Sequence, residues 1–256
     1  MSINGLDLTI LGPAFLAGML VLATHVPMGM QVLARGIVFI DLAIAQIAGL
    51  GVVAADGMGW EPQGWAVQVV AVSAALLGGV LLTYTEKRWP DIQEALIGVL
   101  FVLAASGGVL LLANNPHGGE HLKDLLVGQI LWVNFSQLLP VVLLTAVILV
   151  MWFGFRERLG RLGFYWMFAL AVTASVQLVG VYLVFASLIV PALACRRYPL
   201  RWRLPISYTL GVLGYALGLI LSSLYDLPSG AVIVWTLAGL GLVVYALKLD
   251  RLTRNT

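Results

Sequence analysis

Apolar residues fill long stretches of the chain, and short polar turns separate them. The stretches run at residues 8–26, 37–55, 65–84, 92–113, 137–154, 164–179, 180–195, 205–224 and 231–247. Most approach the roughly 20 residues that a helix needs to cross the hydrocarbon core of a bilayer. Because backbone polar groups in lipid must be satisfied within the segment, each stretch is predicted to be helical. The pattern predicts an all-α, polytopic transmembrane helical bundle with about 8–9 membrane segments.

Composition supports a single membrane unit. Of the 256 residues, 61% are hydrophobic and 10% are charged, and the mean hydropathy is +1.00. No polar stretch is long enough for a soluble domain, so residues 1–256 are predicted to form one transmembrane domain. The net charge of +2 is small and the basic residues lie in short turns. This argues against nucleic acid as a partner and makes the lipid bilayer the expected surroundings.

The distribution of Lys and Arg predicts the topology. Basic residues occur at Arg35, at 87–88, at 156–161, at 196–203 and in the tail at 248–254. Because cytoplasmic loops carry an excess of Lys and Arg, all of these turns are expected in the cytoplasm. That is possible only if residues 163–195 cross the membrane an even number of times. We therefore predict a broken or re-entrant pair of segments near 164–195 with a hinge at 177–180, an outside N-terminus and a cytoplasmic C-terminus.

Asp41 is the least expected residue, because it lies inside the apolar stretch 37–55. A carboxylate near the bilayer centre costs roughly 2.5–3.5 kcal/mol on translocon scales. We expect it to face an aqueous path, a partner group or a cation, so transport is the first function to test. The alternative is a carboxylate capped by a neighbouring hydroxyl or backbone group at the membrane edge. Gln46 is five residues further on and points some 140° away from Asp41 on a helix.

Histidines supply further candidates. His25 is in an apolar stretch, and imidazole is a common ligand for transition metals. The alternative is a neutral histidine that is hydrogen-bonded inside the bundle. The polar turn at 114–124 holds His117, Glu120 and His121, which are ligand types that zinc accepts. This turn is expected outside, either as a metal-capturing loop or as a solvated linker.

Five segments carry a resemblance to a known family. They read Arg35-GIVFIDLAIAQIAGLG, Glu94-ALIGVLF, Leu125-LVGQILWVN, Val179-GVYLVFASLIVPALACRR and Tyr225-DLPSGAVIV. The Ile-Val-Pro-Ala run and the Tyr-Asp-x-Pro-Ser-Gly turn are the specific matches. Over nearly its whole length, the chain resembles the membrane permeases of zinc and manganese ABC importers. The helical fold of that family is related to that of vitamin-B12-type permeases.

The resemblance implies a function and a set of partners. It implies import of a divalent metal ion, zinc first and manganese second, with the Asp41 carboxylate contacting the ion in transit. The ion is cargo, and no permanently bound cofactor is expected. A homodimer of permease subunits, a cytoplasmic ABC ATPase subunit and an extracytoplasmic solute-binding protein are the expected partners. The chain has no Gly-rich phosphate loop, so it is not expected to be an enzyme by itself.

Two departures from the family pattern keep alternatives open. Ala45 stands where the family has a histidine one turn after the carboxylate, which leaves Gln46 or His25 as pathway candidates. The family's coupling helix is reduced to Phe155-RERLGRLG, whose Arg156, Glu157, Arg158 and Arg161 are the candidates for ATPase contact. Alternatively, those arginines only keep this segment on the cytoplasmic side of the membrane. A permease for a metal chelate or small solute, or a non-transporting scaffold, are the alternative functions.

Overall fold

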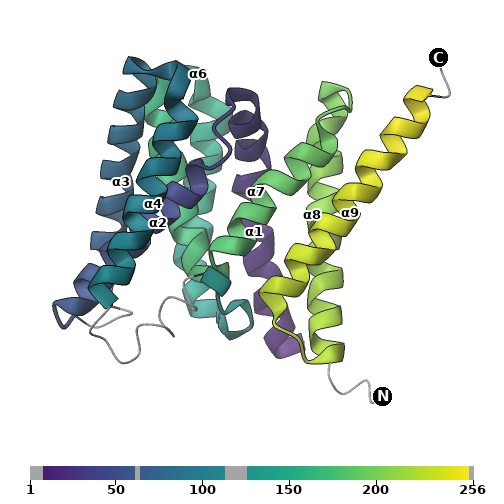
Figure 1. Cartoon of the computed structure of the whole chain (residues 1–256). Helices are drawn as coiled ribbons and strands as arrows, with labels where there is room; N and C mark the ends of the chain where they lie inside the picture. Colours follow the sequence, from purple (N-terminus) through teal and green to yellow (C-terminus); the bar gives the residue numbers. More distant parts are fainter. Residues whose placement is uncertain (1–7, 61–63, 113–125, 254–256) are drawn as a thin grey trace.

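The computed structural model describes residues 8–60, 64–112 and 126–253, and in them the chain forms a bundle of helices that run up and down (Figure 1). The helices are α1 (Leu8–Arg35), α2 (Ile40–Gly57), α3 (Trp65–Arg88), α4 (Gln93–Leu112), α6 (Phe135–Val179), α7 (Val181–Cys195), α8 (Leu200–Tyr225) and α9 (Ser229–Thr253). Short 3₁₀ turns precede α4 and α6, namely η2 (Pro90–Ile92) and η3 (Ile130–Trp132). The predicted all-α fold is confirmed.

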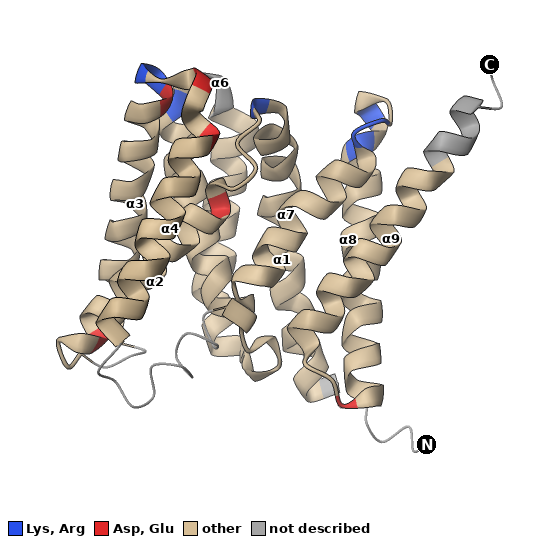
Figure 2. Ribbon diagram, viewed as in Figure 1, with Lys and Arg blue, Asp and Glu red and all other residues tan. Residues whose placement is uncertain are grey.

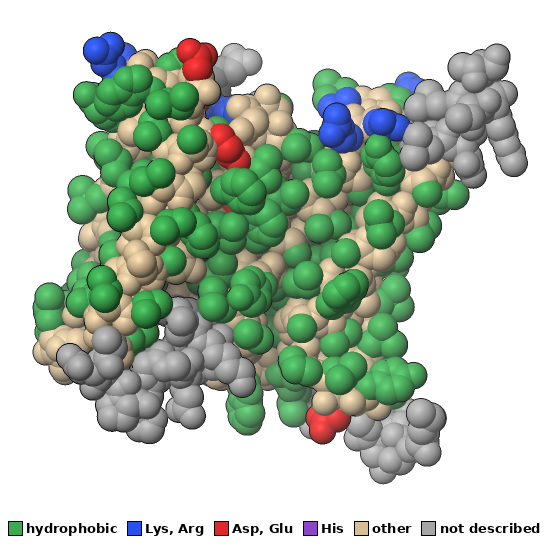
Figure 3. Space-filling view, viewed as in Figure 1, with side chains coloured by type: hydrophobic (Ala, Val, Ile, Leu, Met, Phe, Trp, Pro, Cys, Tyr) green, Lys and Arg blue, Asp and Glu red, His purple; other side chains and the backbone are tan. Residues whose placement is uncertain are grey.

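Within these residues, eight segments are long and apolar enough to cross a membrane. α6 supplies two of them, Phe135–Phe155 and Gly160–Val179, whereas α7 is apolar but shorter. The predicted number of membrane segments, including a short one near 180–195, is therefore confirmed. On the face of the bundle shown in Figure 3, hydrophobic side chains cover the middle and charged ones lie mainly toward the ends, as a lipid-facing surface requires.

The short basic segment 155–163, expected to be a turn, lies instead within α6. Only Gly160 leaves helical geometry, with φ 59° and ψ −156°. Glycine adopts a positive φ without the steric cost of a Cβ atom, so the chain changes direction at one residue and needs no loop. The two arms of α6 on either side of Gly160 then form separate membrane-crossing segments.

Lys and Arg side chains gather at one end of the bundle (Figure 2). This end holds the last turns of α1 and α3, the Gly160 bend of α6 and the link from α7 to α8. The second arm of α6 runs away from this end and α7 runs back toward it, as the even number of crossings requires (Figure 1). The break between them is at Gly180, with φ 82°, inside the predicted hinge.

The second arm of α6 lies at the centre of the core. Within its span, Gly160–Val179, 67% of an 18-residue apolar window is buried, against 22% of the window in Phe135–Phe155. Glycines in α8 let this helix approach α1 and α9 closely. A Cβ atom added at Gly211 would lie 2.6 Å from Leu22, and one added at Gly214 would lie 2.4 Å from Leu237. Such contacts are how membrane helices pack without a hydrophobic driving force between them.

The segment before η3 fills the break between α6 and α7. Gly128 has φ 70°, and a Cβ atom there would lie 2.3 Å from the backbone of Val179. A Cβ atom at Gly180 would lie 2.4 Å from the backbone nitrogen of Gly128. At the start of α9, a Cβ atom at Gly230 would lie 2.8 Å from the carbonyl oxygen of Val127. Three elements distant in sequence therefore meet backbone to backbone at this point.

Candidate ion-binding site inside the bundle

The link between α1 and α2 carries Asp41 into the bundle. α1 ends at Arg35, and Gly36, with φ 71°, turns the chain inward. In Figure 1, α2 begins below the level at which α1 ends. Asp41 is in the first turn of α2, rather than in a helix that already begins at residue 37, and its side chain is only 2% exposed. The helix therefore begins three residues later than expected.

The Asp41 carboxylate is buried without a partner. Neither Oδ1 nor Oδ2 has a hydrogen-bond partner among the described residues. The backbone N–H groups of Asp41 and Leu42 are near enough to interact electrostatically, as the positive end of a helix does with an anion. They do not meet the geometry of a hydrogen bond. A buried group of this kind is rare, because leaving it unpaired costs the desolvation of the charge. The only capping groups near the carboxylate in the described residues are these backbone N–H groups, and no hydroxyl caps it.

A second carboxylate, Glu94, is near enough to Asp41 to interact with it electrostatically, and the sequence did not indicate it as part of the site. Glu94 is in the first turn of α4, and its Oε1 accepts a hydrogen bond from the backbone N–H of Phe39 at 3.3 Å. Its Oε2 is buried and has no hydrogen-bond partner among the described residues. Glu94 also interacts electrostatically with Asp41. The only indication in the sequence was that Glu94 is a carboxylate at the start of an otherwise apolar stretch.

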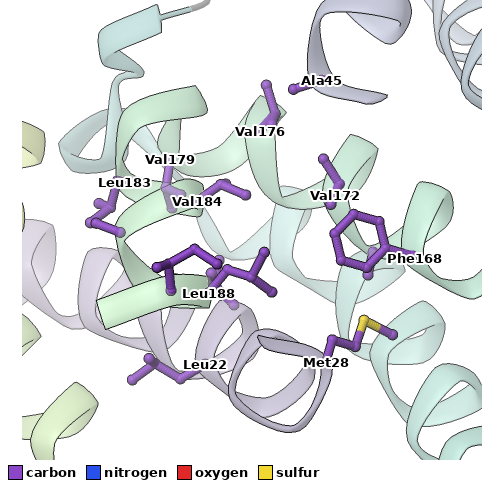
Figure 4. Close-up of a cluster of buried hydrophobic side chains, with 14 of the residues drawn as sticks. Leu22, Met28, Ala45, Phe168, Val172, Val176, Val179, Leu183, Val184 and Leu188 are labelled. Atoms are coloured by element: carbon purple, nitrogen blue, oxygen red, sulfur yellow. The ribbon is translucent and has the colours of Figure 1, made fainter. Parts of the chain in front are cut away.

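The position one turn after Asp41 is apolar. Ala45 is 3% exposed and lies at the edge of the buried hydrophobic cluster, next to Val176 of α6 (Figure 4). Gln46 is half-buried on the neighbouring position of α2. Asp41 therefore has no nitrogen ligand at the spacing where the resemblance would place one.

His25 is wholly buried in α1 and is partly satisfied. Its Nδ1 lies 2.9 Å from the carbonyl oxygen of Val21 and 3.0 Å from the hydroxyl of Thr24. Its Nε2 is buried without a hydrogen-bond partner. The predicted alternative, a histidine hydrogen-bonded inside the bundle, is thus confirmed for one ring nitrogen. In the described part of the chain, no three His, Cys, Asp or Glu side chains gather into a group that could hold a metal ion.

The remaining candidates lie at the two ends of the molecule. His117, Glu120 and His121 are outside the described residues. Arg158 and Arg161 are exposed beside the Gly160 bend of α6. Arg156 and Glu157 belong to the same helix, and their side chains are outside the described part of the structure.

A connected polar cluster lies at the end of the bundle that carries the basic residues. Arg35 pairs with Glu86 at 3.8 Å and places its guanidinium 4.2 Å from the centre of the Phe164 ring. Gln93 donates a hydrogen bond to the hydroxyl of Tyr165 at 3.3 Å. The cluster, defined here as these five side chains, joins α1, α3, α4 and α6.

These features define the class of protein. In the described residues, the chain has eight apolar spans, charged ends and a carboxylate inside the bundle without a hydrogen-bond partner. These are the properties of a multi-pass membrane protein with an intramembrane functional group. The chain belongs to the ABC 3 transport family, whose family model matches residues 7–164 and 154–248. It is accordingly a membrane-spanning permease subunit of an ATP-binding-cassette transport system.

Proteins of similar sequence are named as membrane proteins of metal transport or uptake systems. The manganese transport system membrane protein MntC of Halalkalibacterium halodurans is 26% identical over 80% of this chain and 76% of its own length. The high-affinity zinc uptake system membrane protein ZnuB of Haemophilus influenzae is 24% identical over 88% of this chain and 92% of its own. The structure of PsaBC from Streptococcus pneumoniae in complex with Fab includes a similar fold. Its TM-score is 0.73 at 22% identity, over 95% of this chain and 94% of that one.

Proposed function

We propose that this chain carries a divalent metal ion, zinc or manganese, across the cytoplasmic membrane as the permease subunit of an importer. The observation that carries the proposal is the Asp41 carboxylate, which is buried in the bundle and whose oxygens have no hydrogen-bond partner in the described residues. A carboxylate offers the oxygen ligands that a divalent ion accepts after it leaves water. The names of the relatives, which refer to manganese and zinc transport, agree with this assignment.

In the proposed mechanism, Asp41 is a transient ligand rather than a permanent site. A single strong group compensates part of the lost hydration of the ion, and the sparse ligand set lets the ion leave again. His25, with its free Nε2, and the half-buried Gln46 are further candidates for lining the path. ATP binding and hydrolysis in a separate cytoplasmic ATPase supply the energy, because this chain has no phosphate-binding loop of its own.

The proposed assembly contains two copies of this chain, an ABC ATPase subunit and an extracytoplasmic solute-binding protein. The end with the arginines faces the cytoplasm, which places the N-terminus outside and the C-terminus inside. Arg158 and Arg161, with their neighbours Arg156 and Glu157, then form the contact with the ATPase. The turn with His117, Glu120 and His121 lies outside, where it receives metal from the binding protein.

The proposal is tested with Asp41→Asn, which keeps the side-chain size and removes the charge. Radioactive zinc and manganese uptake is measured in cells that lack their own importers for these metals and express the complete transporter. We expect the variant to insert normally and to lose uptake of its cargo by at least about 10–100-fold. Asp91→Asn, an exposed carboxylate in η2, is the matched control and is expected to transport normally.

Normal metal uptake by Asp41→Asn would exclude this residue from the path. If the wild-type complex moves neither metal while it still hydrolyses ATP, the cargo is a chelate or a small solute. If the chain does not co-purify with an ATPase subunit, the scaffold alternative is favoured.

A further inference from the structure

The first turns of α2 and α4 meet at the site, and this brings two carboxylates together. The backbone N–H of Phe39, two residues before Asp41, donates to Glu94 Oε1 at 3.3 Å. α2 and α4 pack against each other beyond this contact. Asp41 and Glu94 therefore belong to one site, although they are 53 positions apart in the sequence (94 minus 41).

The electrostatics of this pair favour binding of a cation. Asp41 is 2% exposed with both oxygens unpartnered, and Glu94 has one buried, unpartnered oxygen. Two carboxylates at close range repel each other, most strongly where water is excluded. Arg35, at the end of α1, pairs with Glu86 and stacks on Phe164. Among the described residues, no Lys or Arg forms an ion pair with either Asp41 or Glu94.

The ligand atoms at the site are all oxygen. Ala45 removes the nitrogen ligand one turn after Asp41. His25 commits Nδ1 to Val21 and does not join a three-ligand group with the acids. Carboxylate and water ligands suit magnesium, calcium and manganese, whereas imidazole ligands suit zinc.

We propose that Asp41 and Glu94 together form an all-oxygen cation site, with water completing the coordination, and that the cargo is a hard divalent ion of the manganese type. Glu94 is then a second ion ligand. This inference rests on the proposed function, and it goes further by choosing the cargo and adding a ligand. Most protein sites bind zinc more tightly than manganese. Because oxygen ligands narrow this difference in affinity, the availability of the two metals can then select manganese as the cargo.

Binding of Mn²⁺ to the purified, detergent-solubilised permease tests the inference directly and avoids the selectivity of a delivery protein. Electron paramagnetic resonance measures the bound Mn²⁺, and its pulsed form detects any coordinated nitrogen. We expect the wild type to bind Mn²⁺ with no nitrogen signal. Glu94→Gln is expected to lower Mn²⁺ affinity by about 10–100-fold, and Asp91→Asn, three residues away on an exposed position, to leave it unchanged.

Ala45→His is the converse test, because it returns an imidazole to the turn after Asp41. We expect this variant to gain a nitrogen signal and to favour Zn²⁺ over Mn²⁺ by at least about tenfold more than the wild type does. Wild-type Mn²⁺ affinity in Glu94→Gln, or a nitrogen signal in the wild-type protein, would overturn the inference. Either result leaves the proposed function standing if Asp41→Asn still abolishes metal uptake. That function fails separately, if the wild-type transporter moves neither zinc nor manganese.

Discussion

Two polar regions of this molecule, both close to the start of α4, are built in opposite ways. In the cluster of Arg35, Glu86, Gln93, Phe164 and Tyr165, every side chain contacts another member of the cluster. One buried polar atom each of Arg35, Glu86 and Gln93 has no hydrogen-bond partner among the described residues. At Asp41, neither carboxylate oxygen has a hydrogen-bond partner among the described residues, although this side chain is more deeply buried than Arg35 or Glu86.

The difference separates polar groups that hold the fold from polar groups that are kept for a ligand. Partnered side chains that join four helices stabilise their relative positions. A buried carboxylate without a partner lowers the stability of the fold, and such strain is characteristic of functional sites. Removing a side chain from the cluster should therefore lower the stability of the protein, whereas removing the Asp41 carboxylate should raise it.

Removal of the Arg35 side chain should have the largest effect on stability. Arg35→Ala leaves Glu86 without its cation and Phe164 without its stacked guanidinium. Both partners of the ion pair are partly exposed, so we expect a loss of about 2 kcal/mol, below the value for fully buried pairs. The thermal midpoint of the purified protein in detergent is the measurement. Arg88→Ala, at the exposed end of α3, is the control, and equal losses in the two variants would remove the distinction between the regions.

Removal of the Asp41 carboxylate should act in the other direction. Asp41→Leu replaces an unpartnered polar group by an apolar one of similar size, so the metal-free protein should gain about 1–2 kcal/mol of stability. Metal uptake should be lost at the same time. The thermal midpoint, measured with a chelator present, decides the sign. A loss of stability as large as that of Arg35→Ala would mean that Asp41 has a structural partner.

Replacement of His25 should change the stability of the protein least, because it combines a lost contact with the removal of an unpartnered atom. His25→Leu loses the contact of Nδ1 with Val21, but it also removes the unpartnered Nε2. The two effects oppose each other, so stability should stay within about 1 kcal/mol of the wild type. Uptake should fall less than in Asp41→Asn. An equally complete loss of uptake would make His25 a primary ligand and would contradict the all-oxygen site.

Much of the fold could be predicted from the sequence because membrane spans are encoded locally. Long apolar stretches predicted the helices, and the positions of Lys and Arg predicted that residues 163–195 cross twice with a break near Gly180. The Gly160 bend was missed, because a basic, glycine-containing segment between two spans has the pattern of a turn. The prediction of a single transmembrane domain remains a prediction.

The site was less predictable, because its geometry depends on contacts between helices. Asp41 was identifiable as a carboxylate among apolar residues. Glu94 was interpretable as an ordinary acidic residue at a helix start, and only the packing of α4 on α2 brings it to Asp41. The pairing of Arg35 with Glu86 is likewise a tertiary contact, and the sequence indicated only that both lie at helix ends.

The contact between Gly128 and Gly180 has a mechanical consequence. A break between two membrane helices usually acts as a hinge, because few backbone bonds resist bending there. Here the backbone of the η3 segment occupies the break, and the start of α9 closes on the same segment. Tilting of α7 about Gly180 must push on the chain before α6 and on α9 together. We therefore expect the start of α7, the segment before η3 and the start of α9 to move together rather than as separate helices.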